Sequence, residues 1–175
     1  MHVRVKTIIV ALSALGLAAV IYYNSDMGMQ VQWAGYYPNI SDLYESSDVI
    51  IRGIVRESHR RVSDDIETVH QVEILDLIKG QYNENAIPVT QMGGSYFIGK
   101  VVEPDDFPLF DRGDEVVLFL KQWGNGVYRS LGGPQGSYMV IEGKVYSVGE
   151  KLERVHSPGL SVNGTEVNVF CDMIS

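Results

Sequence analysis

The pattern of hydrophobic and polar positions divides the chain into an apolar N-terminal run and a body with strand-like periodicity. Residues 7–23 form an uncharged run, preceded by Arg4 and Lys6 and followed by Asp26. A membrane-spanning helix needs roughly 17–25 apolar residues, so the run is long enough for one. Basic residues before it and an acidic residue after it predict a cytoplasmic N-terminus and a body outside the cytoplasm.

The same run is also compatible with a cleaved signal peptide. Such a peptide has a shorter apolar core and small residues at the cut, which residues 16–18 supply. The apolar run nevertheless continues to Tyr22 and Tyr23, whose rings suit a membrane interface. The pattern therefore favours an uncleaved signal anchor over residues 1–24, with secretion after cleavage as the alternative. Residues 25–38 are then a linker and residues 39–175 one extracytoplasmic domain.

Strand signals dominate the body. Runs that alternate or are rich in β-branched residues, bounded by turn residues, predict strands over residues 49–57, 66–79, 86–92, 115–122, 127–131, 137–141 and 144–148. Gly53 and a phase shift over residues 75–78 indicate bulges. Pro88 suits an edge strand. Within residues 115–122, we expect Leu118 and Leu120 on one face and Phe119 on the other.

Two short helices complete the expected fold. Asn39 is placed to cap a helix through Ser46, and Thr165 is placed to cap a C-terminal one. Apolar residues of the second helix recur at helical spacing, at Val167, Phe170, Cys171 and Ile174. Because bulged strands in a small meander favour closure, we expect a mainly β fold, a small OB-like barrel with one or two short helices.

The charge and the cysteine content of the chain exclude some classes of function. The chain has a formal net charge of −8 and one cysteine, Cys171. Binding to a phosphate backbone depends on Lys and Arg, so we expect no nucleic-acid partner. A lone cysteine forms no intramolecular disulfide and excludes an all-cysteine zinc site.

Part of the chain resembles a known family. Residues 47–53 (SDVIIRG) lead into a strand ending at Lys79-Gly80, and residues 113–120 (GDEVVLFL) follow later. This order is similar to netrin-like modules, including the N-terminal domains of tissue inhibitors of metalloproteinases, and to small exported bacterial proteins of undefined function. The resemblance covers about half of the chain and implies an OB-type five-stranded barrel with a binding role. The inhibitors act through an N-terminal cysteine and a disulfide-braced ridge, and no cysteine here matches, so no inhibitory residue is carried over.

A search for catalytic chemistry finds no specific motif. HExxH and G-x-S-x-G patterns are absent, and Ser58 and His59 are adjacent only in sequence. His70, on an alternating strand, is interpreted as a structural residue. The acidic stretch 103–115 leaves a metal-dependent hydrolase as the alternative function. A structural envelope protein, joined through an intermolecular Cys171 disulfide, is a third possibility.

The connection over residues 93–114 is the candidate functional loop. It is long for a structureless connection, and such loops are usually functional or disordered. We expect a non-catalytic, membrane-tethered binding module without a cofactor, whose partner is a protein or small molecule outside the cytoplasm. The candidate partner-binding residues in this loop are Tyr96, Phe97, Asp105, Asp106, Phe107 and Phe110.

Overall fold

The computed structural model describes residues 28–29, 33, 35–62, 66–95, 101–124, 126–148 and 162–175. The expected membrane segment, residues 7–23, lies outside these ranges, so its prediction stays a prediction. None of the helices within these ranges has the length and apolar character to cross a membrane.

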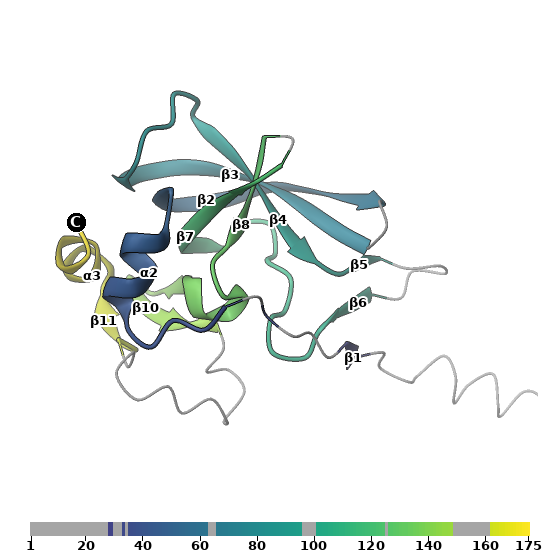
Figure 1. Ribbon diagram of the computed structural model, residues 1–175. Helices are drawn as coiled ribbons and strands as arrows, with labels where there is room; N and C mark the ends of the chain where they lie inside the picture. Colours follow the sequence, from purple (N-terminus) through teal and green to yellow (C-terminus); the bar gives the residue numbers. More distant parts are fainter. Residues whose placement is uncertain are drawn as a thin grey trace, which may run out of the picture.

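Five strands of the body form a closed ring. They follow one another in the order β2-β3-β4-β8-β7, and β7 pairs again with β2 (Figure 1). Every neighbouring pair is antiparallel except β4 and β8, which meet in parallel through Val89 and Tyr128. The bounds are β2 (Val49–Val62), β3 (Ile66–Lys79), β4 (Ala86–Met92), β7 (Glu115–Trp123) and β8 (Val127–Ser130).

A smaller sheet extends from β7, because this strand changes partners along its length. Its first half pairs with β9 and its second half with β8. The short 3₁₀ helix η2 (Gly133–Gly136) connects these two partners, and the extension continues through β9 (Ser137–Ile141), β10 (Lys144–Ser147) and β11 (Thr165–Glu166). A separate small sheet joins β1 (Gly28–Met29), β6 (Val101–Pro104) and β5 (Gly94–Ser95).

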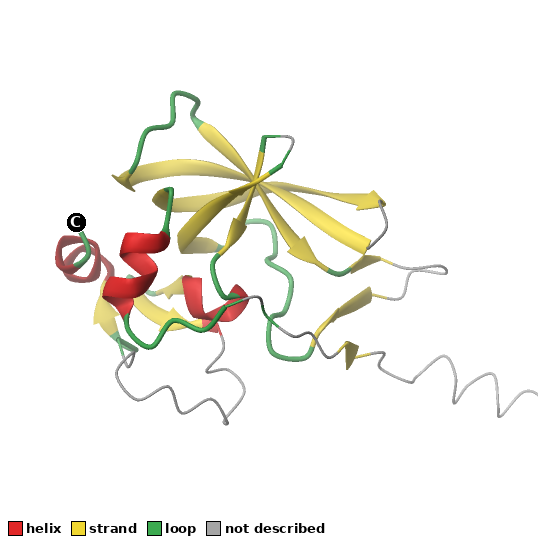
Figure 2. Cartoon of the chain, viewed as in Figure 1, coloured by secondary structure: helices red, strands yellow, loops and turns green. Residues whose placement is uncertain are grey.

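The two α-helices lie on the same side of the molecule as this extension (Figure 2). They are α2 (Ile40–Ser46) and α3 (Val167–Met173). Leu43 of α2 and Phe170 of α3 belong to one buried cluster with Phe119 of β7. The outer face of β7 is therefore covered by helices and not by solvent.

The barrel interior forms a second buried cluster. Leu118 and Leu120 belong to it together with residues of β2, β3 and β4, whereas Phe119 lies in the cluster beneath the helices. The expected division of β7 into two faces is confirmed, and both faces are buried. This explains why the strand is a continuous apolar run.

The mainly β class is confirmed, and several local predictions agree with the structure. The register between β2 and β3 shifts beside Gly53, where an added Cβ would lie 2.5 Å from the Glu73 carbonyl oxygen. Leu75 and Ile78 have no direct partner on β2. The phase shift predicted over residues 75–78 therefore corresponds to two irregularities in the pairing of β3 with β2. The Asn39 side chain accepts a hydrogen bond from the Asp42 amide at 2.9 Å, as a helix cap does.

Other expectations are corrected. Thr165 is not the cap of α3: it pairs with Val145 in β11, and the cap position belongs to Glu166, whose side chain makes no capping bond. Pro88 is paired with β3, and its strand also meets β8, so β4 is not a free edge. The short strands β1, β5, β6 and β11 were not predicted, because pieces of two to four residues carry no periodicity.

The residues that carried the family resemblance hold α2 against the barrel. The Lys79 ammonium donates to the carbonyl oxygens of Tyr44 and Ser47 at the end of α2. A cation at the C-terminal end of a helix is favourable, because the carbonyl groups there carry partial negative charge. Gly80 has a positive φ of 87°, and a Cβ there would lie 2.3 Å from the Asp48 carbonyl oxygen. The Lys-Gly pair is therefore explained by packing.

Candidate functional site

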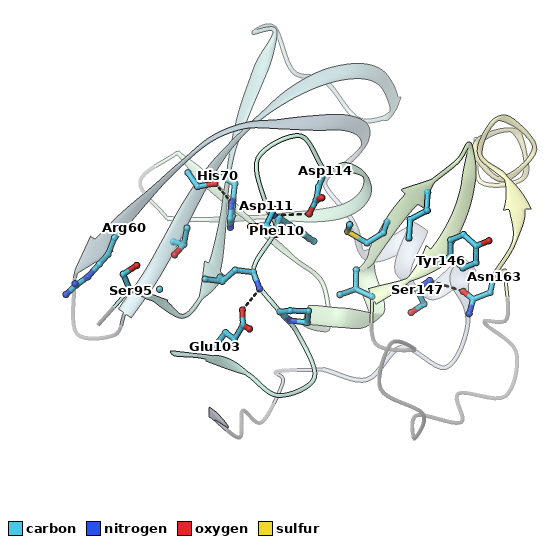
Figure 3. A pocket seen from close by; sticks show the side chains of 18 residues that line it. Arg60, His70, Ser95, Glu103, Phe110, Asp111, Asp114, Tyr146, Ser147 and Asn163 are labelled. Atoms are coloured by element: carbon cyan, nitrogen blue, oxygen red, sulfur yellow. Dashed lines mark hydrogen bonds between the residues drawn. The ribbon is translucent and has the colours of Figure 1, made fainter. Parts of the chain in front are cut away.

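A pocket of about 730 Å³ lies beside one end of the barrel. Its walls come from the second half of β2, the first half of β3, the loop between β6 and β7, and the β9–β10 hairpin (Figure 3). Ligand pockets of small domains usually have volumes of roughly 300–1,000 Å³. The space is therefore large enough for a small molecule or a short stretch of polypeptide.

The loop between β6 and β7 is held against the barrel by a buried amide. Gln91 of β4, 1% exposed, accepts a hydrogen bond from the Phe110 amide at 2.9 Å and donates to the Pro108 carbonyl oxygen at 3.3 Å. Phe110 is itself 4% exposed and contacts the His70 ring edge-on. Because both partners of the amide belong to the loop, Gln91 fixes the wall of the pocket that the loop provides.

Phe107 packs in the barrel core against Trp33, a residue of the predicted linker. It is 2% exposed, and its ring meets that of Trp33 at a centroid distance of 5.4 Å. Trp33 Nε1 donates to Asp106 Oδ2 at 2.7 Å, and its ring packs directly on Gly133. The chain just before the domain is thus bound to the loop and to η2 by one indole.

His70 and Ser58 face each other across β2 and β3 at the pocket wall. Ser58 Oγ and His70 Nδ1 share a hydrogen bond of 2.7 Å, while His70 Nε2 makes no hydrogen bond of normal geometry with a described residue. Burial lowers the pKa of His70 from 6.5 to about 4, and His59 adds to the shift, whereas Gln91 and Asp111 oppose it. The ring is therefore neutral at neutral pH.

This pair does not have the properties of a catalytic serine and base. A general base works best with a pKa close to the operating pH, and the pKa of His70 lies well below neutrality. No carboxylate among the described residues hydrogen-bonds the ring to orient it, as a nucleophile's base requires. The serine–histidine contact is better explained as the satisfaction of a buried imidazole.

The charged lining of the pocket is mostly acidic. Its charged residues are three carboxylates, Glu103, Asp111 and Asp114, and one arginine, Arg60, and within the described ranges none of the four takes part in an ion pair. Neighbouring cations are already paired: Arg61 lies 2.7 Å from the Glu67 carboxylate, which also binds Arg129. The pocket therefore carries an excess of uncompensated carboxylates.

Carboxylates of the acidic stretch mainly support the backbone. Glu103 Oε2 accepts from the Leu109 amide at 2.8 Å, and Asp114 Oδ2 accepts from the Asp111 amide at 2.9 Å. Glu115 forms an ion pair with Arg52 at 2.7 Å. In the part of the chain that the structure describes, no three His, Cys, Asp or Glu side chains are grouped so as to hold a metal ion. The metal-dependent alternative stays a hypothesis.

The six candidate loop residues divide into three groups. Tyr96 and Phe97 lie outside the described residues. Phe107 and Phe110 are buried in the barrel core, and Phe110 also lines the pocket. Asp105 is exposed and Asp106 is bound to Trp33, and neither lines the pocket. A partner-binding role for these residues stays a prediction.

Sequence reasoning missed most of the pocket lining. Ser58 and Arg60 lie beyond the predicted strand end at Glu57, Thr68 lies on a strand that was predicted, and Tyr146 and Asn163 lie near the C-terminal hairpin. One available signal was the occurrence of polar residues on the inward-facing side of β3, where Thr68 and His70 are buried. Buried polar side chains need partners, so they indicate a polar space nearby.

Comparison with protein-family models, with curated proteins and with solved structures found no match to this chain.

Proposed function

We propose that this chain is a non-catalytic, extracytoplasmic binding module of the OB-type, netrin-like kind, tethered to a membrane by its N-terminal helix. The ring of five strands supports the OB-type class, because such barrels are built from five strands. The order of the residues around Lys79-Gly80 and at the start of β7 supports the netrin-like comparison.

The observation that carries the binding role is the pocket beside the barrel end. It combines an apolar wall with polar groups that can still form hydrogen bonds or ion pairs, which is the usual composition of a ligand site. Its wall is built from strands and from a loop anchored by Gln91, so the site is preformed. The partner is a protein or small molecule outside the cytoplasm.

The two rival functions receive less support. Glu103 and Asp114 accept hydrogen bonds from backbone amides, Asp106 accepts one from Trp33 and Glu115 pairs with Arg52, so four of the six carboxylates of residues 103–115 already have partners within the fold. Cys171 is half-buried, and burial raises the pKa of its thiol above 9.0 although Arg52 opposes the shift. A higher thiol pKa leaves less reactive thiolate for an intermolecular disulfide.

Site-specific photo-cross-linking tests the binding role. A photoreactive amino acid replaces Ile141, which lines the pocket and is 45% exposed, or Leu77, which is 42% exposed and lies away from it. In intact cells, we expect an adduct of defined mass from position 141 and none from position 77. Equal adducts at both positions, or none at position 141, would show that the pocket is not the binding site.

Protease treatment of spheroplasts tests the tether and the location. We expect protease added from outside to degrade the body of the protein while residues 1–24 stay with the membrane. Complete protection of the body would contradict the proposed topology.

A further inference from the structure

The second half of β2 has a free edge beside the pocket. β2 pairs with β3 over residues 50–62, but with β7 only over residues 49–54. Val55 still exchanges hydrogen bonds with Gly113 and Asp114, and after it no described residue pairs with that edge. Residues 57–62 therefore carry backbone groups available for a further strand.

A gap between β2 and β9 adjoins this edge. β7 lies between β2 and β9, with Ile54 and Val140 both opposite Glu115, the first residue of β7. Neighbouring strands are roughly 4.8 Å apart, so β2 and β9 are separated by roughly 10 Å where β7 begins. Ser58 and Arg60 on one side and Ile141 on the other all line the pocket. Asp114 and Gly113, the two residues before β7, bond to Val55 and hold the first part of the line of β7, and the pocket lies beside them.

The lining also indicates the kind of strand that fits. Glu103, Asp111 and Asp114 are without ion-pair partners among the described residues, against the single guanidinium of Arg60. Apolar side chains of Phe110, Met139 and Val148 lie along the same space. An occupant with positive charge and an apolar side chain complements both features.

We propose that the pocket binds an extended, positively charged segment of a partner polypeptide, which adds as a strand to the free edge of β2 and continues β7. This inference deepens the proposed binding function and rests on it. Main-chain hydrogen bonds to residues 57–62 supply affinity, and alternate side chains of the segment enter the pocket and supply selectivity. The charged side chains along residues 57–61 restrict pairing with other edges, as charges on native edge strands do.

The test uses the full chain in detergent micelles and linear nine-residue peptides displayed on phage. We expect the selected peptides to be rich in Lys and Arg and to alternate apolar and polar positions. Synthetic versions are then methylated on the backbone nitrogens of either the odd or the even residues. Since only alternate amides of an added strand face the edge, one set should weaken binding by at least tenfold and the other should change it little.

Hydrogen exchange and matched variants provide independent readouts. Peptide binding should slow amide exchange in residues 57–61 and leave residues 50–54, already paired on both sides, unchanged. Asp111→Asn should weaken binding several-fold, whereas Asp105→Asn, in the same loop but outside the pocket, should not.

Three outcomes would overturn strand addition. In the first, both methylated sets bind as tightly as the parent peptide. In the second, exchange at residues 57–61 does not slow. In the third, no peptide is selected although position 141 cross-links a partner in cells. All three leave the proposed binding function intact, whereas failure of the cross-linking at position 141 removes that function itself.

Discussion

Acidification should destabilise the protein through one buried histidine, His70. The unfolded chain takes up a proton on this ring near pH 6.5, whereas the folded chain does so only near pH 4. The neutral ring is therefore favoured in the folded state, and its stabilising contribution is complete above pH 6.5 and decreases as the pH falls. The unfolding free energy decreases by about 1.4 kcal/mol for each pH unit, and its total loss between pH 6.5 and pH 4 is about 3 kcal/mol.

The range from pH 7 to pH 5 isolates this effect, because the carboxylates change charge mainly below it. At pH 5 the expected loss is about 2 kcal/mol of unfolding free energy. The assay is urea unfolding of the full chain in detergent at several pH values. His70→Gln should remove most of the slope, and His59→Gln, on the exposed side of β2, should leave it in place. Equal slopes in the wild type and His70→Gln would refute the burial argument.

Four further substitutions test the packing. Leu118→Ala and Leu120→Ala should each cost about 2–5 kcal/mol in urea unfolding, because both side chains are fully buried in the barrel, and an unchanged midpoint for both would place β7 at the periphery. Lys79→Met should cost about 1.5–3 kcal/mol through loss of the charged bonds to α2, with Lys121→Met, whose side chain is half exposed, as the milder control. Trp33→Phe should lose the bond to Asp106 and raise protease cleavage in the 101–114 loop, whereas Trp123→Phe, at an exposed position, should not.

The regular elements of the barrel could be predicted because their signals are local. The bounds of β3, β4 and β9 agree with the expected ranges, since each run has turn residues at both ends. β2 extends five residues beyond its expected end at Glu57. Residues 58–61 of this extra part are all polar, so the sequence gives no hydrophobic alternation along them.

The site was harder to predict because it depends on contacts between distant parts of the chain. Phe107 and Phe110 were recognised as costly to leave in water, and they are in fact buried, but in the core of the barrel. Their place depends on Trp33 and Gln91, 74 and 19 residues away along the chain respectively. No periodicity connects such residues. The gap beside β2 is equally invisible, because it depends on where β7 begins relative to two other strands.

The central claim is that the pocket beside the barrel end binds the partner. The most direct measurement is purification of the full chain from membranes with whatever binds to it, for the wild type and for two variants of similar exposure. Ile141→Trp fills the pocket, and Leu77→Trp adds the same bulk away from it. We expect the partner to remain with the wild type and with Leu77→Trp and to be lost from Ile141→Trp. Retention of the same partner by all three proteins would contradict the account.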